Sequence, residues 1–499
     1  MLLADRSSAV RQQAGAGLLV AQVALALVGA GAIAGFVASV WYQRSDGTSP
    51  MSWGTISVAI AVGGAAALTA ARLPSTAVSS FLDRIGRLPG GIAAAVVVGV
   101  VLRLLLALAL APQPASDGAT YLALASRLAE GDAYVSDGRL AYWPPGLPLA
   151  LAPLLWIGLP KPVAVLALGL GAFIVAALGL ARVVASAGRP ERASAAVWVL
   201  ALWPPYVLCA GLPEKELLVV ALMPWIVDRA IAAYRGSLGA AVTAGVLTGL
   251  AVLVQPSLQL LPVAGALLAL LLCRRHGLRV VVMLVAAILA MVAVVTPWTV
   301  RNVVTLGVPV FVSTNGGDVL YRANNELATG AYRPSGAVDL RHLDELSLDR
   351  ESKRLAVEWI TSNPAGFVQL GAAKALMFLG EDSYGAYAVF QRGKVEVGRT
   401  TYLVIKAATA LPWLVLWCAT LALALQRRNW ERHVDADALA FVVLPVVYLL
   451  VIHSVFESGP KYHFPVLALA IAAFAIVSPS TADRSRRSRP AARQSETAA

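Results

Sequence analysis

The segment GIAAAVVVGVVLRLLLALALA, residues 91–111, is the clearest indication of the fold class, because Arg103 is its one charged residue. A helix of roughly 17–25 apolar residues is long enough to cross the hydrocarbon core of a bilayer. Similar apolar blocks recur along all 499 residues, of which 58% are hydrophobic and 14% charged. In soluble domains about a quarter of the residues are charged, and disordered chains contain fewer apolar residues than this chain does. The sequence therefore predicts an all-α polytopic membrane protein.

The apolar blocks predict a bundle of about 12 transmembrane helices. A shorter, proline-containing apolar segment at 144–160 predicts an interfacial helix in addition. We expect the twelve spans at 16–41, 53–72, 91–111, 162–184, 193–210, 214–234, 238–254, 257–273, 279–297, 401–425, 438–455 and 461–478.

Arginine collects in the loops on one side of this bundle, and the positive-inside rule makes that side cytoplasmic. We therefore expect both termini in the cytoplasm and the two longest loops, 112–143 and 298–400, outside the cell membrane. Within the second loop, an amphipathic stretch at 350–362 and an apolar one at 367–379 predict surface helices. The arginines in question are Arg6, Arg11, Arg72, Arg84, Arg87, Arg189, Arg192, Arg229, Arg235, Arg274, Arg275, Arg279, Arg427, Arg428 and Arg432.

Composition along the chain indicates five regions. They are a two-helix membrane extension at 1–88, a membrane core with the first outer loop at 89–297, the large outer loop at 298–400, C-terminal membrane helices at 401–478, and a basic, disordered cytoplasmic tail at 479–499. The net charge of +12 does not indicate nucleic-acid binding, because the basic residues lie in loops that orient membrane helices.

Polar residues at the edge of a bilayer are costly and often functional, and here they gather on the predicted outer side. Asp117, Glu214, Arg301, Lys461 and Tyr462 all fall at outer helix ends. A carboxylate can take a proton from a hydroxyl nucleophile, and fixed cations can stabilise a departing phosphate. These residue types suit transfer of a sugar from a lipid-linked phosphate.

Three further polar residues have a simpler interpretation. Lys215 and Glu216 are expected to be solvated neighbours of Glu214. Arg103 lies near mid-membrane and must find a partner inside the bundle, either an acid or backbone carbonyls.

Six motifs, in this order along residues 90–480, resemble the GT-C superfamily of polyprenyl-phosphate-sugar glycosyltransferases, in particular the protein O-mannosyltransferase and aminoarabinose-transferase-like branch. The first outer loop contains Asp117 and then a proline-rich segment, as in that branch. The motifs are Asp117–Tyr121, Tyr142–Pro148, Pro213–Glu214, Thr296–Asn302, Ser313–Gly317 and Lys461–Pro465.

The resemblance implies a GT-C-like fold with extracytoplasmic loop helices and an inverting transfer. Asp117 would be the catalytic base and Glu214 a supporting acid, while the donor phosphate would contact Arg301, Lys461 and Tyr462. The predicted substrate-binding residues are Tyr121, Tyr142, Trp143 and Asn315. The implied partners are a polyprenyl-phosphate-linked sugar, membrane lipid, and an acceptor glycan, lipid or protein.

Two positions depart from these relatives. Gly118 stands where the O-mannosyltransferases have a second acid, and Tyr142–Trp143 stand where the aminoarabinose transferases have a charged pair. The resemblance therefore does not identify the sugar or the acceptor.

The chemistry requires no metal or other cofactor. The three cysteines (Cys209, Cys273 and Cys418) are far apart, and no residues have the spacing of metal ligands. The sequence leaves open a divalent cation held by scattered acids of the outer loops.

Two other classes of function remain compatible with the sequence. A transporter or lipid flippase would use ionisable groups or broken helices near the midplane, with repeat symmetry. A scaffold protein of the cell envelope would leave the outer charged residues dispersed around the rim instead of lining one cavity.

Overall fold

The computed structural model describes residues 2–44, 49–70, 72, 75–272, 277–334, 336–426 and 434–479. Within these ranges the secondary structure is helical, apart from one isolated bridge between Ser136 and Arg139. Outside the described residues lie Cys273, Arg274, Arg275, Arg427, Arg428, Arg432 and the tail after Pro479.

The α-helices are α1 (Leu2–Arg44), α2 (Trp53–Ala70), α3 (Ser75–Gly86), α4 (Gly91–Leu110), α5 (Asp117–Ala129), α6 (Gly146–Trp156), α7 (Lys161–Ser186), α8 (Ala193–Ala201), α9 (Pro204–Leu208), α10 (Glu216–Tyr234), α11 (Leu238–Val254), α12 (Leu261–Leu272), α13 (Gly277–Leu306), α14 (Gly316–Ala323), α15 (Glu345–Ser362), α16 (Pro364–Leu379), α17 (Tyr384–Tyr387), α18 (Arg399–Leu425), α19 (Ala436–Val455) and α20 (Leu467–Val477).

The predicted polytopic membrane architecture is confirmed. Among the described residues, eight helices are long and apolar enough to cross a membrane, and the bent pair Pro190–Ala201 and Pro204–Gly211 makes a ninth. The other three expected spans are also helical but shorter, as α11, Pro256–Leu272 and Phe464–Val477. The eight are Gly17–Val40, Trp53–Ala70, Gly91–Leu110, Lys161–Ser186, Glu216–Tyr234, Gly277–Leu306, Arg399–Leu425 and Ala436–Val455.

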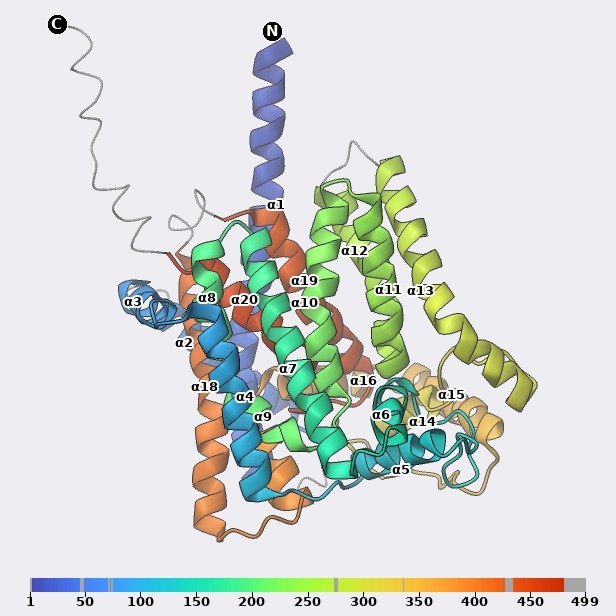
Figure 1. The fold of residues 1–499 in the computed structure, drawn as a ribbon. Coiled ribbons are helices and arrows are strands. Elements are labelled where there is room, and N and C mark those ends of the chain that lie inside the picture. The colour runs from blue at the N-terminus through green and yellow to red at the C-terminus, as the bar shows by residue number, and fades with distance from the viewer. Residues whose placement is uncertain are drawn as a thin grey trace, which may run out of the picture.

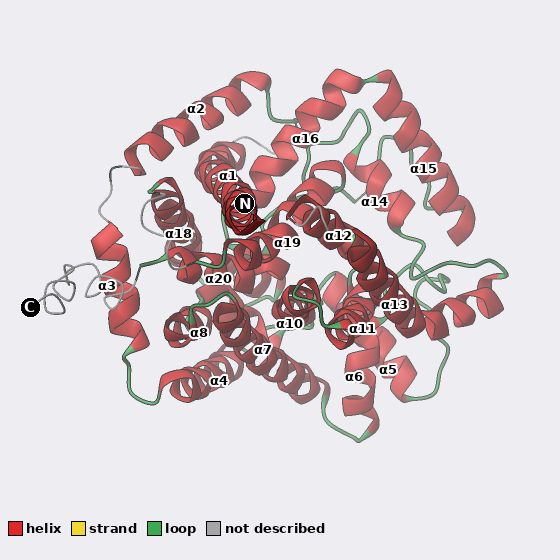
Figure 2. Ribbon diagram, turned by 90° about the horizontal axis from the view of Figure 1, so that it is seen from above, coloured by secondary structure: helices red, strands yellow, loops and turns green. Residues whose placement is uncertain are grey.

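The helices form a bundle with a different character at each end (Figure 1). The first turns of α1 project from the upper end, and the short helices α5, α6, α14 and α15 collect at the lower end. Figure 2 shows α1, α10 and α18 close to end-on, whereas α2, α3 and α15 are seen lengthwise. The helices expected at 350–362, 367–379 and 144–160 are present as α15, α16 and α6.

Two helices at opposite ends of the chain contribute to the core of the bundle: α20 is entirely inside it, and the Gly17–Val40 part of α1 is 50% buried. Every residue of α20 is buried, so its apolar sequence contacts protein on all sides. Residues of α1 such as Leu25 and Val28 belong to the same hydrophobic core. Gly35 of α1 lies so close to the carbonyl oxygen of Leu376 that a Cβ would be 2.2 Å from it. The first helix is therefore packed into the body of the protein.

Arg103 of α4 is 1% exposed and binds backbone carbonyls, which is one of the two partners that the sequence predicts. Its guanidinium donates to the oxygens of Gly99 at 3.1 Å and Ala201 at 3.0 Å, and it lies 3.7 Å from the centre of the Phe173 ring. The carbonyl of Ala201 needs a donor because α8 ends there, before Pro204 and Pro205. A proline has no N–H, so the usual donor to this carbonyl, from residue 205, is missing.

We expect the Arg103→Met variant to lower the stability of the bundle by about 1–3 kcal/mol, because it leaves the buried carbonyl of Ala201 without a donor. Thermal unfolding in detergent measures this change. Leu105→Met is the matched control, since Leu105 is on the same helix and 59% exposed. An Arg103→Met protein as stable as the parent would contradict the interpretation.

Candidate active site at the lower end of the bundle

A cavity of about 1250 Å³ opens among the short helices at the lower end. Its walls come from the start of α5, the loop after it, the start of α10, the turn between α11 and α12, α14, and the end of α19. The predicted site residues that line it are Asp117, Tyr121, Tyr142, Trp143, Asn315 and Tyr462, and its other charged lining residues include Arg139, Lys215, Glu216, Arg322, Arg341, Glu345 and Glu457.

At one side of this cavity, the ammonium of Lys461 lies among three carboxylates. Its Nζ is 3.4 Å from Asp117 Oδ2, 3.4 Å from Glu214 Oε2 and 3.6 Å from Glu216 Oε1. Asp117 and Lys461 are 344 residues apart in the sequence. The structure thus brings together Asp117, Glu214 and Lys461, as the sequence predicts for one site, and adds Glu216.

The side chain of Asp117 is 40% exposed, whereas those of Glu214 and Glu216 are 11% and 4% exposed. Burial favours the protonated form of Asp117, but the charges of Lys461, Lys215 and Arg392 outweigh it and lower the pKa of the carboxyl. Burial also works against the charge of Lys461, but its acidic neighbours raise the pKa of this ammonium well above its usual value. Asp117 is therefore an ionised carboxylate that a substrate can reach.

The local fold explains why Asp117 points into the cavity. It is the first residue of α5, and Ser116 before it has a φ of 51°, an unfavourable conformation for a residue with a side chain. Strained backbone of this kind is concentrated at functional sites. At Gly118, a Cβ would come within 3.2 Å of Pro213. The Pro213 segment would have to shift slightly to admit any side chain at residue 118.

Tyr384 joins this cluster from α17. Its hydroxyl donates a 2.8 Å hydrogen bond to Glu214 Oε1, and the Lys461 Nζ lies 5.7 Å from the centre of its ring. Burial raises the pKa of Tyr384 well above its usual value, so the hydroxyl keeps its proton. Glu214 is held by Tyr384 and Lys461 together.

A second polar network follows the cavity wall and includes two of the predicted residues. Arg322 pairs with Asp318 at 3.4 Å and with Glu457 at 3.3 Å. Tyr142 donates its hydroxyl hydrogen to Asp318, and Tyr462 donates to Glu457 at 3.1 Å. Burial raises the pKa of Glu457 to about 7. This network fixes the orientation of both tyrosines.

Aromatic rings line the wall between the two networks. Tyr121 and Tyr142 each meet Trp143 edge to face, with ring centres 5.4 and 5.3 Å apart. The guanidinium of Arg139 lies 4.8 Å from the centre of the Tyr142 ring. Asn315, at the start of α14, accepts a 2.9 Å hydrogen bond from the Ser313 hydroxyl through its Oδ1. Tyr142 and Trp143 place apolar rings beside polar groups, an arrangement that suits the faces and hydroxyls of a sugar, whereas Tyr121 is only 3% exposed.

Arg301 of α13, like Glu214 and Lys461, is absent from the cavity lining, but it also lies outside their cluster. Its guanidinium donates to the carbonyl oxygens of Leu140 at 2.6 Å and Tyr134 at 3.0 Å. Glu345 accepts from the N–H groups of Leu140 and Ala141 in the same loop. The contacts of Arg301 thus hold the loop that carries Tyr142 and Trp143, and they do not place its charge beside Asp117.

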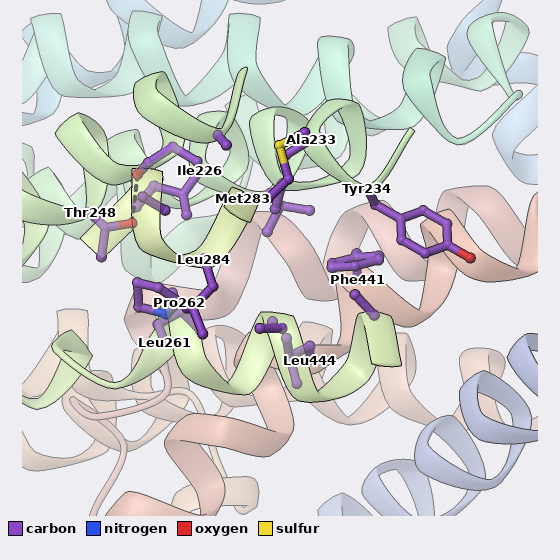
Figure 3. A pocket seen from close by; sticks show the side chains of 18 of the residues that line it. Ile226, Ala233, Tyr234, Thr248, Leu261, Pro262, Met283, Leu284, Phe441 and Leu444 are labelled. Atoms are coloured by element: carbon purple, nitrogen blue, oxygen red, sulfur yellow. Dashed lines mark hydrogen bonds between the residues drawn. The ribbon is translucent and has the colours of Figure 1, made fainter. Parts of the chain in front are cut away.

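A second cavity, of about 300 Å³, lies between α10, α11, α12, α13 and α19 (Figure 3). Its lining is apolar apart from Tyr234, Thr248 and Arg279, and the Thr248 hydroxyl already donates to the carbonyl of Ala244. It has no carboxylate, so the wider cavity holds the groups that can perform acid–base chemistry. Among the described residues, no three His, Cys, Asp or Glu side chains are arranged to hold a metal ion.

Sequence reasoning missed several residues of the site. Tyr384 belongs to no recognised motif, and its neighbour Gly385 packs against the backbone of Pro205, a contact that only the fold reveals. Glu216 was expected to be solvated but is 3% exposed. The spacing of Glu214 and Glu216 around Lys215 was the one available signal, because three consecutive charges at the start of an apolar helix are costly.

Neither a protein-family model nor a curated protein sequence matches the chain. Among solved structures, one similar chain is the archaeal oligosaccharyltransferase AglB from Archaeoglobus fulgidus, solved in complex with an inhibitory peptide and a dolichol-phosphate. The TM-score is 0.42 and the sequence identity 10%, and the match covers 77% of this chain. It covers 50% of the archaeal chain, so this chain spans about half the length of that enzyme.

Proposed function

We propose that the protein is a GT-C-type membrane glycosyltransferase, which moves a sugar from a polyprenyl-phosphate donor to an acceptor hydroxyl. The observation that supports this most directly is the position of Asp117. Its carboxylate is ionised, partly exposed and held 3.4 Å from Lys461 in a cavity at the end of a membrane bundle. The predicted GT-C motifs that carry Asp117, Tyr142, Asn315 and Tyr462 all contribute to the same cavity.

The proposed reaction is a single displacement. Asp117 removes the proton of the acceptor hydroxyl while the oxygen of that hydroxyl attacks the anomeric carbon of the donor sugar. The bond between that carbon and the phosphate oxygen breaks, and polyprenyl phosphate leaves with the electron pair. Attack opposite to the leaving group inverts the configuration at the anomeric carbon.

The remaining predicted residues have supporting roles in this proposal. Glu214 positions Lys461 and Tyr384, and Lys461 keeps Asp117 ionised. Tyr121, Tyr142 and Trp143 would contact the sugar faces, and Asn315 its hydroxyls. The side of the membrane follows from the predicted orientation: the arginine-rich loops are cytoplasmic, so the cavity, which is lined by residues of the loops 112–143 and 298–400, opens outside the cell membrane.

A direct assay tests the function. Purified protein is incubated with a panel of radiolabelled polyprenyl-phosphate sugars and a crude envelope fraction that supplies acceptors. We expect label to pass from the lipid phase to an acceptor, with release of one polyprenyl phosphate per sugar transferred. Movement of the intact labelled lipid across proteoliposomes, without cleavage, would instead support a flippase and contradict the proposal.

A further inference from the structure

The three residues predicted to bind the donor phosphate are already engaged. Lys461 is shared by three carboxylates, and Arg301 by two carbonyl oxygens. The hydroxyl of Tyr462 donates to Glu457. A phosphate brought to Lys461 would have to compete with three acids that already share this one ammonium. The departing phosphate therefore needs another cation.

Lys215 is a cation in the cavity that meets this need. It lines the cavity and directly precedes α10. Within the described ranges its side chain has no hydrogen bond or ion pair, whereas Arg322 and Arg341 of the same lining are paired with acids. Lys215 and Asp117 line the same cavity, and the charge of Lys215 contributes to the lowered pKa of Asp117. The positive end of the α10 dipole adds to its field.

We propose that the Lys215 ammonium binds the phosphate group of the lipid donor and stabilises it as it leaves. This inference rests on the proposed function. The acceptor proton goes to Asp117 and the electron pair of the broken bond to the phosphate oxygen, whose added negative charge faces Lys215. Lys461 then has a different task, which is to hold Asp117 ionised and in place. Arg139, whose guanidinium lies over the Tyr142 ring, is a second cation that lines the cavity.

The surroundings of Lys215 predict how this binding depends on pH. Burial lowers the pKa of Lys215, Lys461 lowers it further, and Glu216, Asp117 and Glu214 oppose the shift. A lysine with a lowered pKa loses its charge at a less alkaline pH than usual, so phosphate affinity should fall as the pH rises. An arginine in its place keeps its charge throughout this range.

The test measures equilibrium binding of unlabelled polyprenyl phosphate to purified full-length protein in detergent. We expect Lys215→Gln to weaken binding about 10- to 100-fold, the usual effect of losing a charge-assisted contact. Lys215→Arg should retain binding and move its alkaline loss to higher pH. The control Lys353→Gln removes an exposed ammonium of α15, paired with Asp349, and should bind as the parent does.

Two further ligands identify the group that is recognised. Polyprenol lacks the phosphate, so its weaker binding should be the same in parent and Lys215→Gln proteins. Inorganic phosphate should compete in the parent only if the site also accepts the free anion. Equal affinity of parent and Lys215→Gln for polyprenyl phosphate would overturn the inference.

The same variants separate this inference from the proposed function. Loss of lipid-phosphate binding in Lys215→Gln, in a protein that transfers no sugar from any donor, would support the phosphate site and contradict the transferase. Sugar transfer by Lys215→Gln with an unchanged KM for the donor would support the transferase and contradict the phosphate site.

Discussion

The Asp117→Asn variant is expected to transfer sugar about 10²–10⁴ times more slowly than the parent, the usual contribution of a general base. An amide has nearly the same shape, and its oxygen still accepts from Lys461, but it cannot take the proton of the acceptor. The loss should appear in kcat, with a KM for the donor close to that of the parent. Steady-state kinetics with the labelled donor measures both constants.

Asp132→Asn is the matched control for this experiment. Asp132 follows the same helix, is 54% exposed, pairs with Arg127 and is absent from the cavity lining. Its variant should be as active as the parent. Full activity in Asp117→Asn, with folding confirmed by size-exclusion chromatography, would show that another group is the base.

Replacement of Lys461 by methionine is expected to have the second-largest effect. It leaves Asp117, Glu214 and Glu216 without the ammonium that they share. Without it, burial and the neighbouring carboxylates favour protonation, and the pKa of Asp117 rises. The base must be ionised to act, so the variant should lose activity mainly at low pH. We expect a loss of about tenfold or more below neutral pH and partial recovery as the pH rises.

The pH profile of kcat/KM tests this assignment, because a purely structural defect would lower the whole curve. Lys461→Arg keeps the positive charge and should restore most of the acid side. Lys406→Met is the control, since Lys406 also pairs with a carboxylate, Glu381 at 3.5 Å, and this pair shares no residue with the cluster around Lys461. A Lys461→Met profile that is lower by one factor at every pH would contradict the electrostatic role.

Most of the helices were predictable, because an apolar block of bilayer length has few alternatives to a helix. What the blocks contact was not predictable. The sequence of α20 is as apolar as that of a lipid-facing helix, yet all its residues are buried in protein. A high hydropathy indicates that a helix avoids water, but it does not indicate whether the helix contacts lipid or protein.

The candidate site was predictable as a set of residues on one side of the membrane, but not as a set of contacts. Topology places Arg301 and Lys461 at the same end of the bundle, and it does not say which way a side chain turns. Arg301 turns toward Leu140 and Tyr134, and Lys461 toward Asp117. The sequence predicts Lys215 and Glu216 as solvated neighbours of Glu214, and the pairing of both acids with Lys461 is visible only in the fold.

The carbonyl of Ala201 has a consequence for biogenesis. Arg103 and Ala201 are 98 residues apart, and α4 is synthesised first. At roughly 5–20 residues per second, the ribosome needs about 5–20 s to supply the partner. During that delay a lone guanidinium in α4 disfavours release into lipid by about 2.5–3.5 kcal/mol. We therefore expect α4 to stay beside the translocon until the bent pair Pro190–Ala201 and Pro204–Gly211 is synthesised, so that α4 and this pair enter the bilayer together.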